Sequence, residues 1–378
     1  MIRITDKSKC TGCTACMNIC PVQCIVMRRD REGFDYPVAN PDICISCGKC
    51  ERICPVQNPL EPSVPLGAFA ARNEEYAEGS SSGGVFPVLA EKVIEDYGAV
   101  FGAVMNPDLT VGHTEASDMK EVGRMRGSKY VQSDMYSVFE EVKCHLESGR
   151  KVLFSGTPCQ VAGLNSYLGR DYDGLLTADC ACHGVPSPGL WEKYVKALQD
   201  RYGSPVKSVR FRDKRRGWRR YEVVVCCEDR EVAVWHQKDP YMLMFLQDMS
   251  LRPSCYQCRF RNGGSGSDLT LADLWNVAEA ALEFDDDKGV SLVLANTNKG
   301  LSALKASGVD MRKVDAGLAM KRNGGFAADL VVPERRQEFF KGHHSAKDII
   351  IYMEGFIRHD SFYKRLRGYV SNIIRRNK

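Results

Sequence analysis

From Leu66 onward, two hydrophobic periodicities alternate along the chain. Short apolar runs predict strands, and apolar residues that recur every three or four positions predict helices, as at Val85, Leu89 and Val93. We expect strands at 66–72, 99–105, 151–154 and 175–182, and a hairpin that pairs 206–211 with 221–227. Helices are expected at 85–97, 136–148, from 163 onward and at 190–202. Such alternation predicts a mixed body of about 240 residues.

Composition narrows the class of protein. The chain has 378 residues, 44% of them hydrophobic, so it is not a mainly disordered protein. A net charge of +4 is too balanced for a protein devoted to nucleic-acid binding. The chain has no run of about 18 apolar residues and no signal peptide at its start, which predicts a cytoplasmic protein without a transmembrane segment. The 17 cysteines are therefore expected to stay reduced and to serve metal or redox chemistry.

Eight of these cysteines form a repeat, C-x2-C-x2-C-x3-C-P, in which Cys44 follows Cys10 by 34 positions. This spacing is typical of ferredoxins with two [4Fe–4S] clusters, where the fourth cysteine of each half ligates the other cluster. Zinc ribbons separate their C-x2-C pairs by longer loops. The repeat therefore predicts cluster one on Cys10, Cys13, Cys16 and Cys54, and cluster two on Cys44, Cys47, Cys50 and Cys20.

The pattern predicts an α+β chain with four segments. A small two-cluster ferredoxin domain is expected at 1–58, and a proline-rich linker at 59–65. A larger mixed α/β body follows at 66–300. An extension at 301–378 is expected to end in a basic helix, because 345–378 is helical in pattern and carries eight Lys/Arg against three Asp/Glu.

Four cysteines of the body border Gly/Pro-rich loops at predicted strand ends, where ligands converge in α/β folds. They are Cys159, Cys182 and the C-x2-C pair Cys255 and Cys258. Four thiolates suffice for a third [4Fe–4S] cluster. The long spacings leave other interpretations open, because the pair also suits zinc and Cys180 shares a strand face with Cys182.

The remaining cysteines are expected to be small buried hydrophobic residues. They are Cys24, Cys144, Cys226 and Cys227.

Seven short motifs then occur in one order. They are Ser81-Ser82-Gly83-Gly84, Gly127-Ser128-Lys129-Tyr130, Gly156-Thr157-Pro158-Cys159-Gln160, Cys182-His183-Gly184-Val185-Pro186-Ser187, Phe211-Arg212-Asp213-Lys214, Arg252-Pro253-Ser254-Cys255-Tyr256-Gln257-Cys258 and Asp273-Leu274-Trp275. With them the chain resembles, over residues 1 to about 300, the beta subunit of coenzyme F420 hydrogenases and dehydrogenases in the form with an N-terminal ferredoxin domain.

The resemblance implies a flavoprotein that binds FAD beside a [4Fe–4S] cluster in its body. The family's cluster cysteines fall on Cys159, Cys182, Cys255 and Cys258. The flavin would exchange two electrons with a soluble partner such as F420, while the clusters pass electrons singly. The residues expected at the FAD are Ser81, Ser82, Gly83, Gly84, Ser128, Lys129 and Asp273. No catalytic residue is assigned.

The residues themselves allow two interpretations of this FAD site. A Ser/Gly loop before a helix suits a phosphate but also serves as an ordinary helix cap. Lys129 suits a pyrophosphate or a reduced flavin, or a place at the surface. Asp273 and Trp275 either line the site or support the cysteine loop. The chain has neither G-x-G-x-x-G nor G-x-x-x-x-G-K-[ST].

Two basic segments have several possible roles. Residues 210–220 hold seven positive residues and one negative. They suit a solvated turn, a dock for an acidic electron carrier or cofactor phosphates, or a nucleic-acid site with Trp218 as a stacking residue. The family motif at 211–214 favours the carrier or cofactor. The segment 348–378 is expected to pack on the body, with an anionic membrane surface or a partner subunit as alternatives.

These features predict an iron–sulfur flavoprotein oxidoreductase that relays electrons between one-electron carriers and a two-electron organic substrate through FAD. Its expected partners are a redox protein, either a ferredoxin or another oxidoreductase subunit, and a small organic electron acceptor or donor, without nucleic acid. The alternative is an electron-transfer adaptor subunit with no substrate site of its own. An open cleft in the body would favour the enzyme, and a filled core the adaptor.

Overall fold

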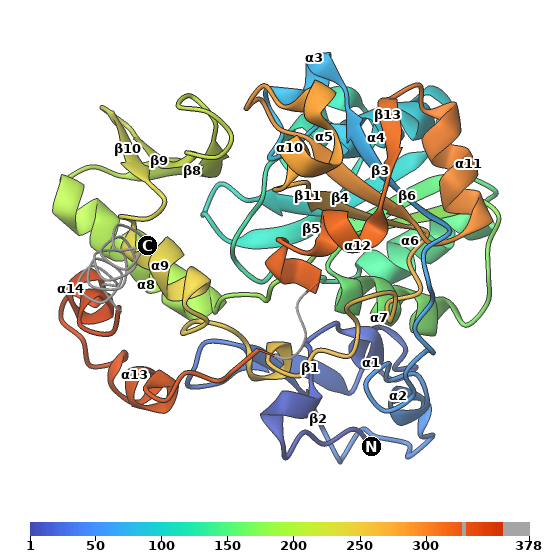
Figure 1. The fold of residues 1–378 in the computed structure, drawn as a ribbon. Coiled ribbons are helices and arrows are strands. Elements are labelled where there is room, and N and C mark those ends of the chain that lie inside the picture. Colours follow the sequence, from blue (N-terminus) through green and yellow to red (C-terminus); the bar gives the residue numbers. More distant parts are fainter. Residues whose placement is uncertain (327–329, 358–378) are drawn as a thin grey trace, which may run out of the picture.

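The computed structural model describes residues 1–326 and 330–357 (Figure 1). An eight-stranded sheet forms the centre of the body, in the order β13-β3-β12-β11-β7-β6-β4-β5. The strands β11, β7, β6 and β4 run parallel to one another, and antiparallel strands flank them. The strands are β3 (Gly67–Arg72), β4 (Ala99–Met105), β5 (Val111–Ala116), β6 (Val152–Gly156), β7 (Leu175–Cys180), β11 (Leu269–Asp273), β12 (Ser291–Ala295) and β13 (Asp310–Val314).

Helices cover both faces of this sheet, because the central strands are apolar on both sides. One apolar core packs α4 (Val85–Glu95), α5 (Met119–Met125) and α11 (Asn298–Ala306) against one face. The other face carries α6 (Val138–Glu147), α7 (Pro158–Leu168), α10 (Val277–Ala280) and α12 (Ala316–Met320). The short elements α3 (Glu74–Ala77), η3 (Leu282–Phe284) and η4 (Gly324–Phe326) lie in connections.

A second layer stands beside the central sheet (Figure 1). It is the antiparallel sheet β10-β9-β8, packed on four helices through one large apolar core. Its strands are β8 (Val206–Asp213), β9 (Glu222–Cys227) and β10 (Glu231–Trp235), and its helices are α8 (Pro188–Tyr202), α9 (Pro240–Leu246), α13 (Arg336–Gly342) and α14 (Ile349–Glu354).

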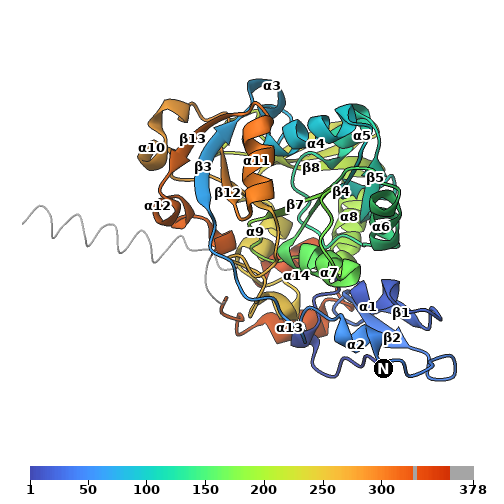
Figure 2. The same ribbon diagram turned by 90° about the vertical axis from the view of Figure 1, so that its right-hand side faces the viewer.

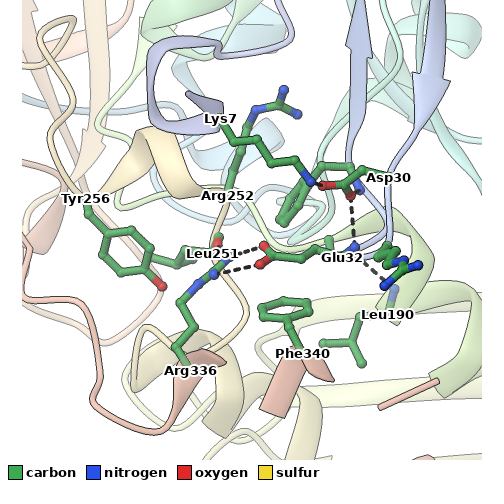
Figure 3. Close-up of polar contacts among 12 residues, drawn as sticks. Lys7, Asp30, Glu32, Leu190, Leu251, Arg252, Tyr256, Arg336 and Phe340 are labelled. Atoms are coloured by element: carbon green, nitrogen blue, oxygen red, sulfur yellow. Dashed lines mark hydrogen bonds and ion pairs between the residues drawn. The ribbon is translucent and has the colours of Figure 1, made fainter. Parts of the chain in front are cut away.

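The cysteine-rich region at 1–58 lies below both layers (Figures 1 and 2). Its hairpin of β1 (Ile25–Arg29) and β2 (Asp35–Ala39) accompanies two short helices, α1 (Ala15–Asn18) and α2 (Lys49–Arg52), and the turn η1 (Lys7–Lys9). Ala15 packs into the core beneath α6 and α7. Glu32 forms a two-pronged ion pair with Arg336 of α13, at 3.1 and 2.6 Å (Figure 3).

Most predicted elements are confirmed, with three differences. The helix expected from residue 163 begins at Pro158, because Thr157 and Gln160 form a capping box. The central sheet extends past the boundary expected at residue 300, because β13 pairs with β3. Of the predicted C-terminal helix, α14 is described and packs on the body as expected, whereas 358–378 lie outside the described residues.

Two cysteines also differ from expectation. Cys144, predicted to be buried, is exposed on α6, and Cys226 is half-buried. Cys24 and Cys227 are buried as predicted. None of the described helices is both long and apolar enough to cross a membrane.

Candidate functional site

The repeat folds into two equivalent loops. Thr14 and Gly48 occupy matching positions and both adopt left-handed backbone geometry, with φ of 64° and 69°, immediately before α1 and α2. This geometry suits glycine but is uncommon for a β-branched residue. Asn18 Nδ2 donates hydrogen bonds to the hydroxyl and carbonyl of Thr14, both at 3.2 Å, which holds that turn.

The cysteines predicted for cluster one lie together. Burial raises the pKa of the Cys13 thiol to about 12, and charge repulsion from Cys10 and Cys54 raises it further. Burial likewise raises the pKa of Cys16, whose charged neighbours include Cys13, Cys10 and Cys54. The crossed assignment, in which Cys54 joins the first half of the repeat, thus agrees with the positions of these thiols.

The cysteines predicted for cluster two surround one small cavity. Its lining includes Cys20, Cys44, Cys47 and Cys50, together with Cys24. The thiols of Cys24 and Cys20 are 3.5 Å apart, and the Cys24 N–H donates to Cys20 Sγ at 3.4 Å. Cys24 is therefore more than a packing residue, because it contacts a predicted ligand. Cys47 is exposed, so this cavity lies at the outer end of the region.

The four body cysteines also converge. Burial raises the pKa of the Cys159 thiol, and repulsion from Cys258, Cys182 and Cys255 raises it further. In residues 1–326 and 330–357, no group of three or more His, Cys, Asp or Glu side chains is arranged to hold a single metal ion. A zinc ion needs its sulfur ligands at about 2.3 Å. The thiols are thus neighbours without the close tetrahedral packing of a zinc site.

Cys180 lies beside this set. A hydrogen bond from Cys180, followed by burial, raises the pKa of the Cys182 thiol. Cys180 is exposed, whereas Cys159, Cys182, Cys255 and Cys258 are half-buried.

The two cysteine regions touch at α7. A Cβ added to Gly163 would lie 2.9 Å from Cys13 Cβ and 3.1 Å from Cys13 Sγ. Charge repulsion from Cys159 also contributes to the raised pKa of Cys13. The cysteines predicted for cluster one and those of the body therefore face each other across this glycine.

A cleft of about 550 Å³ opens between the central sheet and the β8–β10 layer. It lies at the carboxyl ends of β6, β7 and β11, where ligands bind in open α/β sheets. Cys182 and Cys180 form part of its wall, together with Thr157 and Gln160, which flank Cys159. The body cysteines thus border the cleft on one side and Cys13 on the other.

Most residues predicted for FAD line this cleft. They are Ser81, Ser82, Gly84, Ser128, Lys129 and Asp273. Gly83 does not: a Cβ there would lie 2.3 Å from the Ala71 carbonyl oxygen, so this glycine instead allows close packing on β3. The loop is held by the Ser81 hydroxyl, which accepts from the Ser128 N–H at 2.7 Å.

Lys129 has a structural partner set. Its ammonium donates to the carbonyl oxygens of Arg124, Met125 and Arg126 at 2.8–3.0 Å, and so caps the end of α5. Burial lowers its pKa to about 7. Lys129 is therefore neither a free surface lysine nor an unpaired anion-binding group.

Arg212 is a cleft residue that the sequence did not assign to the FAD site. It is buried, and its guanidinium binds both carboxylate oxygens of Asp273 at 3.1 Å. Its Nη2 also donates to the Ser81 carbonyl at 3.2 Å, and Trp275 and Tyr221 lie against its plane. Asp273 thus holds an arginine at the predicted flavin loop, and the motif at 211–214 was the available signal.

The rest of the basic segment is mostly paired with acids. Arg210 and Arg215 both bind Asp213 and Glu231, and Arg219 binds Asp285 and Asp287. Trp218 is fully buried and donates to Asp273 Oδ1 at 3.1 Å, so it is not available to stack on a base.

Two histidines missed from the sequence also line the cleft. His113 is 2% exposed, its Nε2 lies 3.0 Å from the Ser155 carbonyl, and burial lowers its pKa to about 4. His183 Nε2 lies 2.5 Å from Asp248 Oδ1. No spacing between histidines in the sequence marks either residue.

Comparison with known proteins agrees with this arrangement. Residues 149–316 match the family described as the C terminus of the coenzyme F420 hydrogenase/dehydrogenase beta subunit, and residues 9–58 match the 4Fe–4S dicluster domain. No curated protein sequence matches the chain. Among solved structures, a chain of the F420-reducing [NiFe] hydrogenase complex from Methanosarcina barkeri is 18% identical, with a TM-score of 0.47 over 70% of this chain and 88% of that one.

The two family matches divide the molecule as its structure does. The dicluster match covers the cysteine-rich region, and the other match covers β6 to β11, both C-x2-C cysteines and most of the cleft wall. The chain therefore belongs to the coenzyme F420 hydrogenase/dehydrogenase beta-subunit family, in the form with an N-terminal 4Fe–4S dicluster domain.

Proposed function

We propose that the protein is an iron–sulfur flavoprotein oxidoreductase. In this proposal, electrons pass singly through the two clusters of the dicluster domain and a third [4Fe–4S] cluster on Cys159, Cys182, Cys255 and Cys258. They reach FAD in the cleft, where the flavin exchanges two electrons, as a hydride, with a small organic substrate. A redox protein, either a ferredoxin or another oxidoreductase subunit, serves the one-electron end.

One observation carries the proposal: the body cysteines lie between Cys13 of the dicluster domain and the wall of the cleft. A third cluster at that position would connect cluster one with a ligand in the cleft. The exposed Cys47 supports electron entry or exit at cluster two, the far end of the series.

The described residues fit both cofactors. The four body thiols converge without surrounding a single ion, as ligands at the corners of a cluster would. The cleft has a volume in the usual range for cofactor sites. The N-terminus of α4 and the backbone of Gly84 face it beside Arg126 and Arg212, which suits the pyrophosphate of FAD. This chain would bind and orient the flavin, and the β8–β10 layer would exclude water from one side.

Anaerobic reconstitution with iron, sulfide and FAD tests the proposal. We expect about 12 iron atoms per chain, corresponding to three four-iron clusters, and a flavin absorbance that bleaches on reduction. The triple body variant Cys182→Ala/Cys255→Ala/Cys258→Ala should retain about 8 iron atoms. A wild-type protein with about 8 iron atoms and no bound flavin would contradict both assignments.

The open cleft favours this enzyme over the electron-transfer adaptor. The two functions are separated by supplying reduced ferredoxin as donor and testing F420 and other organic acceptors. Turnover of an acceptor that competes with a flavin-site ligand supports the enzyme. Electron transfer only to a protein partner, without a small-molecule acceptor, supports the adaptor.

A further inference from the structure

Arg252 is an arginine with no solvent exposure, placed where the dicluster region meets the body. It precedes the Cys255 and Cys258 pair in the chain, and its backbone carbonyl accepts the N–H of Cys255 at 2.9 Å. Figure 3 shows its side chain pointing away from the Glu32–Arg336 ion pair. Its guanidinium reaches into the loop of cluster one instead.

The guanidinium contacts that loop through each of its three nitrogens. Its Nε donates to the Cys10 carbonyl at 2.8 Å, and Nη2 donates to the Asp35 carbonyl at 2.9 Å and lies 3.8 Å from Cys10 Sγ. Its Nη1 donates to Gln132 Oε1 at 2.9 Å, and Gln132 in turn donates to the Thr11 carbonyl at 2.9 Å.

The chain passes so closely over this group that position 12 must be glycine. A Cβ on Gly12, whose φ is +73°, would lie 3.0 Å from Arg252 Nη1. The ring of Tyr36 covers another side, with its centroid 4.2 Å from the guanidinium carbon. Arg252 is thus built into the contact between the two regions.

Arg252 nevertheless has no carboxylate partner among the residues that the structure describes. Its oxygen partners are all neutral amides, whereas the other two buried arginines of known pairing, Arg212 and Arg336, each bind a carboxylate. A buried guanidinium without a countercharge is costly. The anionic groups within its reach are the predicted cluster ligands Cys10 and Cys255.

We propose that Arg252 is a positioning residue whose charge is balanced jointly by cluster one and the body cluster. This inference rests on the proposed third cluster. A [4Fe–4S] cluster with four thiolates is anionic and becomes more so on reduction, so a nearby fixed positive charge stabilises the reduced form. Arg252 therefore raises the midpoint potentials of both clusters and holds the Cys10 loop against the body.

The test compares Arg252→Gln and Arg252→Lys in the reconstituted full-length protein. Potentials are read by redox titration followed by electron paramagnetic resonance. Arg252→Gln, which removes the charge, should move the midpoint potentials of cluster one and the body cluster downward and leave that of cluster two unchanged. Arg252→Lys, which keeps the charge, should give a smaller shift.

Arg259→Gln is the matched control. Arg259 is an exposed arginine of the same segment that donates to the Val56 carbonyl at 3.1 Å, without contacting a predicted ligand. It should leave all potentials unchanged. The proposal fails if Arg252→Gln, with its iron content intact, keeps every wild-type potential. If Arg252→Gln does not fold, an Arg252→Lys variant with wild-type potentials and a lost domain contact would refute the charge role.

The iron count of the wild type separates this inference from the proposed function. About 8 iron atoms per chain would refute the third cluster. A shift of cluster one in Arg252→Gln would still show that Arg252 sets the potential of a cluster. About 12 iron atoms with unshifted potentials would refute the role of Arg252 alone.

Discussion

Asp273 matters because it neutralises a buried arginine at the cleft. Asp273→Asn would leave the guanidinium of Arg212 without its carboxylate and weaken the acceptor of Trp218. Breaking a pair this buried costs about 3 kcal/mol in the free energy of unfolding. We expect that loss in denaturant unfolding, together with reduced flavin retention on gel filtration. Asp229→Asn, whose partner Arg230 is exposed, should change stability by less than about 0.5 kcal/mol.

His113 should make stability depend on pH. Its pKa is about 4 in the folded protein because of burial, against an ordinary value of about 6.5, so the unfolded chain binds more protons between these values. Stability is therefore present above about pH 6.5 and is lost as the pH falls toward 4. Between pH 7.5 and 5.5 this group should cost about 1.4 kcal/mol.

The measurement is the free energy of unfolding of wild type and His113→Phe over that interval, at pH values mild enough for the clusters. The phenylalanine variant should show a shallower decline. Equal slopes for both proteins would show that His113 titrates normally.

At the residue scale, the sequence predicted ligands better than their surroundings. The spacing of the repeat was enough to pair Cys54 with Cys10 and Cys13, because cluster geometry dictates it. The partners of Lys129 and Arg212 could not be predicted, since they depend on where α5 ends and on which strand lies opposite β8. Cys144 was misplaced because apolar spacing does not show which face of a helix meets the core.

Helix α13 fastens the dicluster region to the body through one ion pair. Arg336 is buried, binds Glu32 with both terminal nitrogens and donates to the Leu251 carbonyl at 2.7 Å (Figure 3). Arg336→Ala should lower the free energy of unfolding by about 2 kcal/mol and increase hydrogen exchange in β1 and β2.

Arg335→Ala is the control on the same helix end. Arg335 pairs with Glu338 at the surface, where such pairs contribute about 0.2–1 kcal/mol. If both variants behave alike, the Glu32–Arg336 pair does not fasten the two regions.

Among the elements, those with local signals were predictable. The strand at 99–105 matched to the residue, because an uninterrupted apolar run specifies a strand buried on both faces. The start of α7 was also written in the sequence, as Thr157-Pro158 with Gln160 following. The edge strand β13 was not predictable, since its exposed, charged pattern becomes a strand only by pairing with β3 across the chain.

For the whole molecule, the clusters should decide the order of unfolding. The dicluster region has a small apolar core, formed by Ile2, Cys24, Ile25 and Cys50, and further cysteines pack around it. Small domains of this kind draw their stability from the bound metal. Removing iron with a chelator under anaerobic conditions should therefore abolish hydrogen-exchange protection in residues 1–58 while the eight-stranded sheet stays protected. Equal loss in both regions would contradict separate stabilisation.

The long sequence separations at the Cys10 and Glu32 contacts also bear on biosynthesis. Arg252 follows Cys10 by 242 positions, and Arg336 follows Glu32 by 304. At roughly 5–20 residues per second, the ribosome delivers Arg336 about 15–60 s after Glu32. Throughout that interval the nascent N-terminal region has no body to dock on. Its cysteines are then open to the cellular machinery that inserts clusters, so metallation of this region can precede the arrival of the arginines that later cover it.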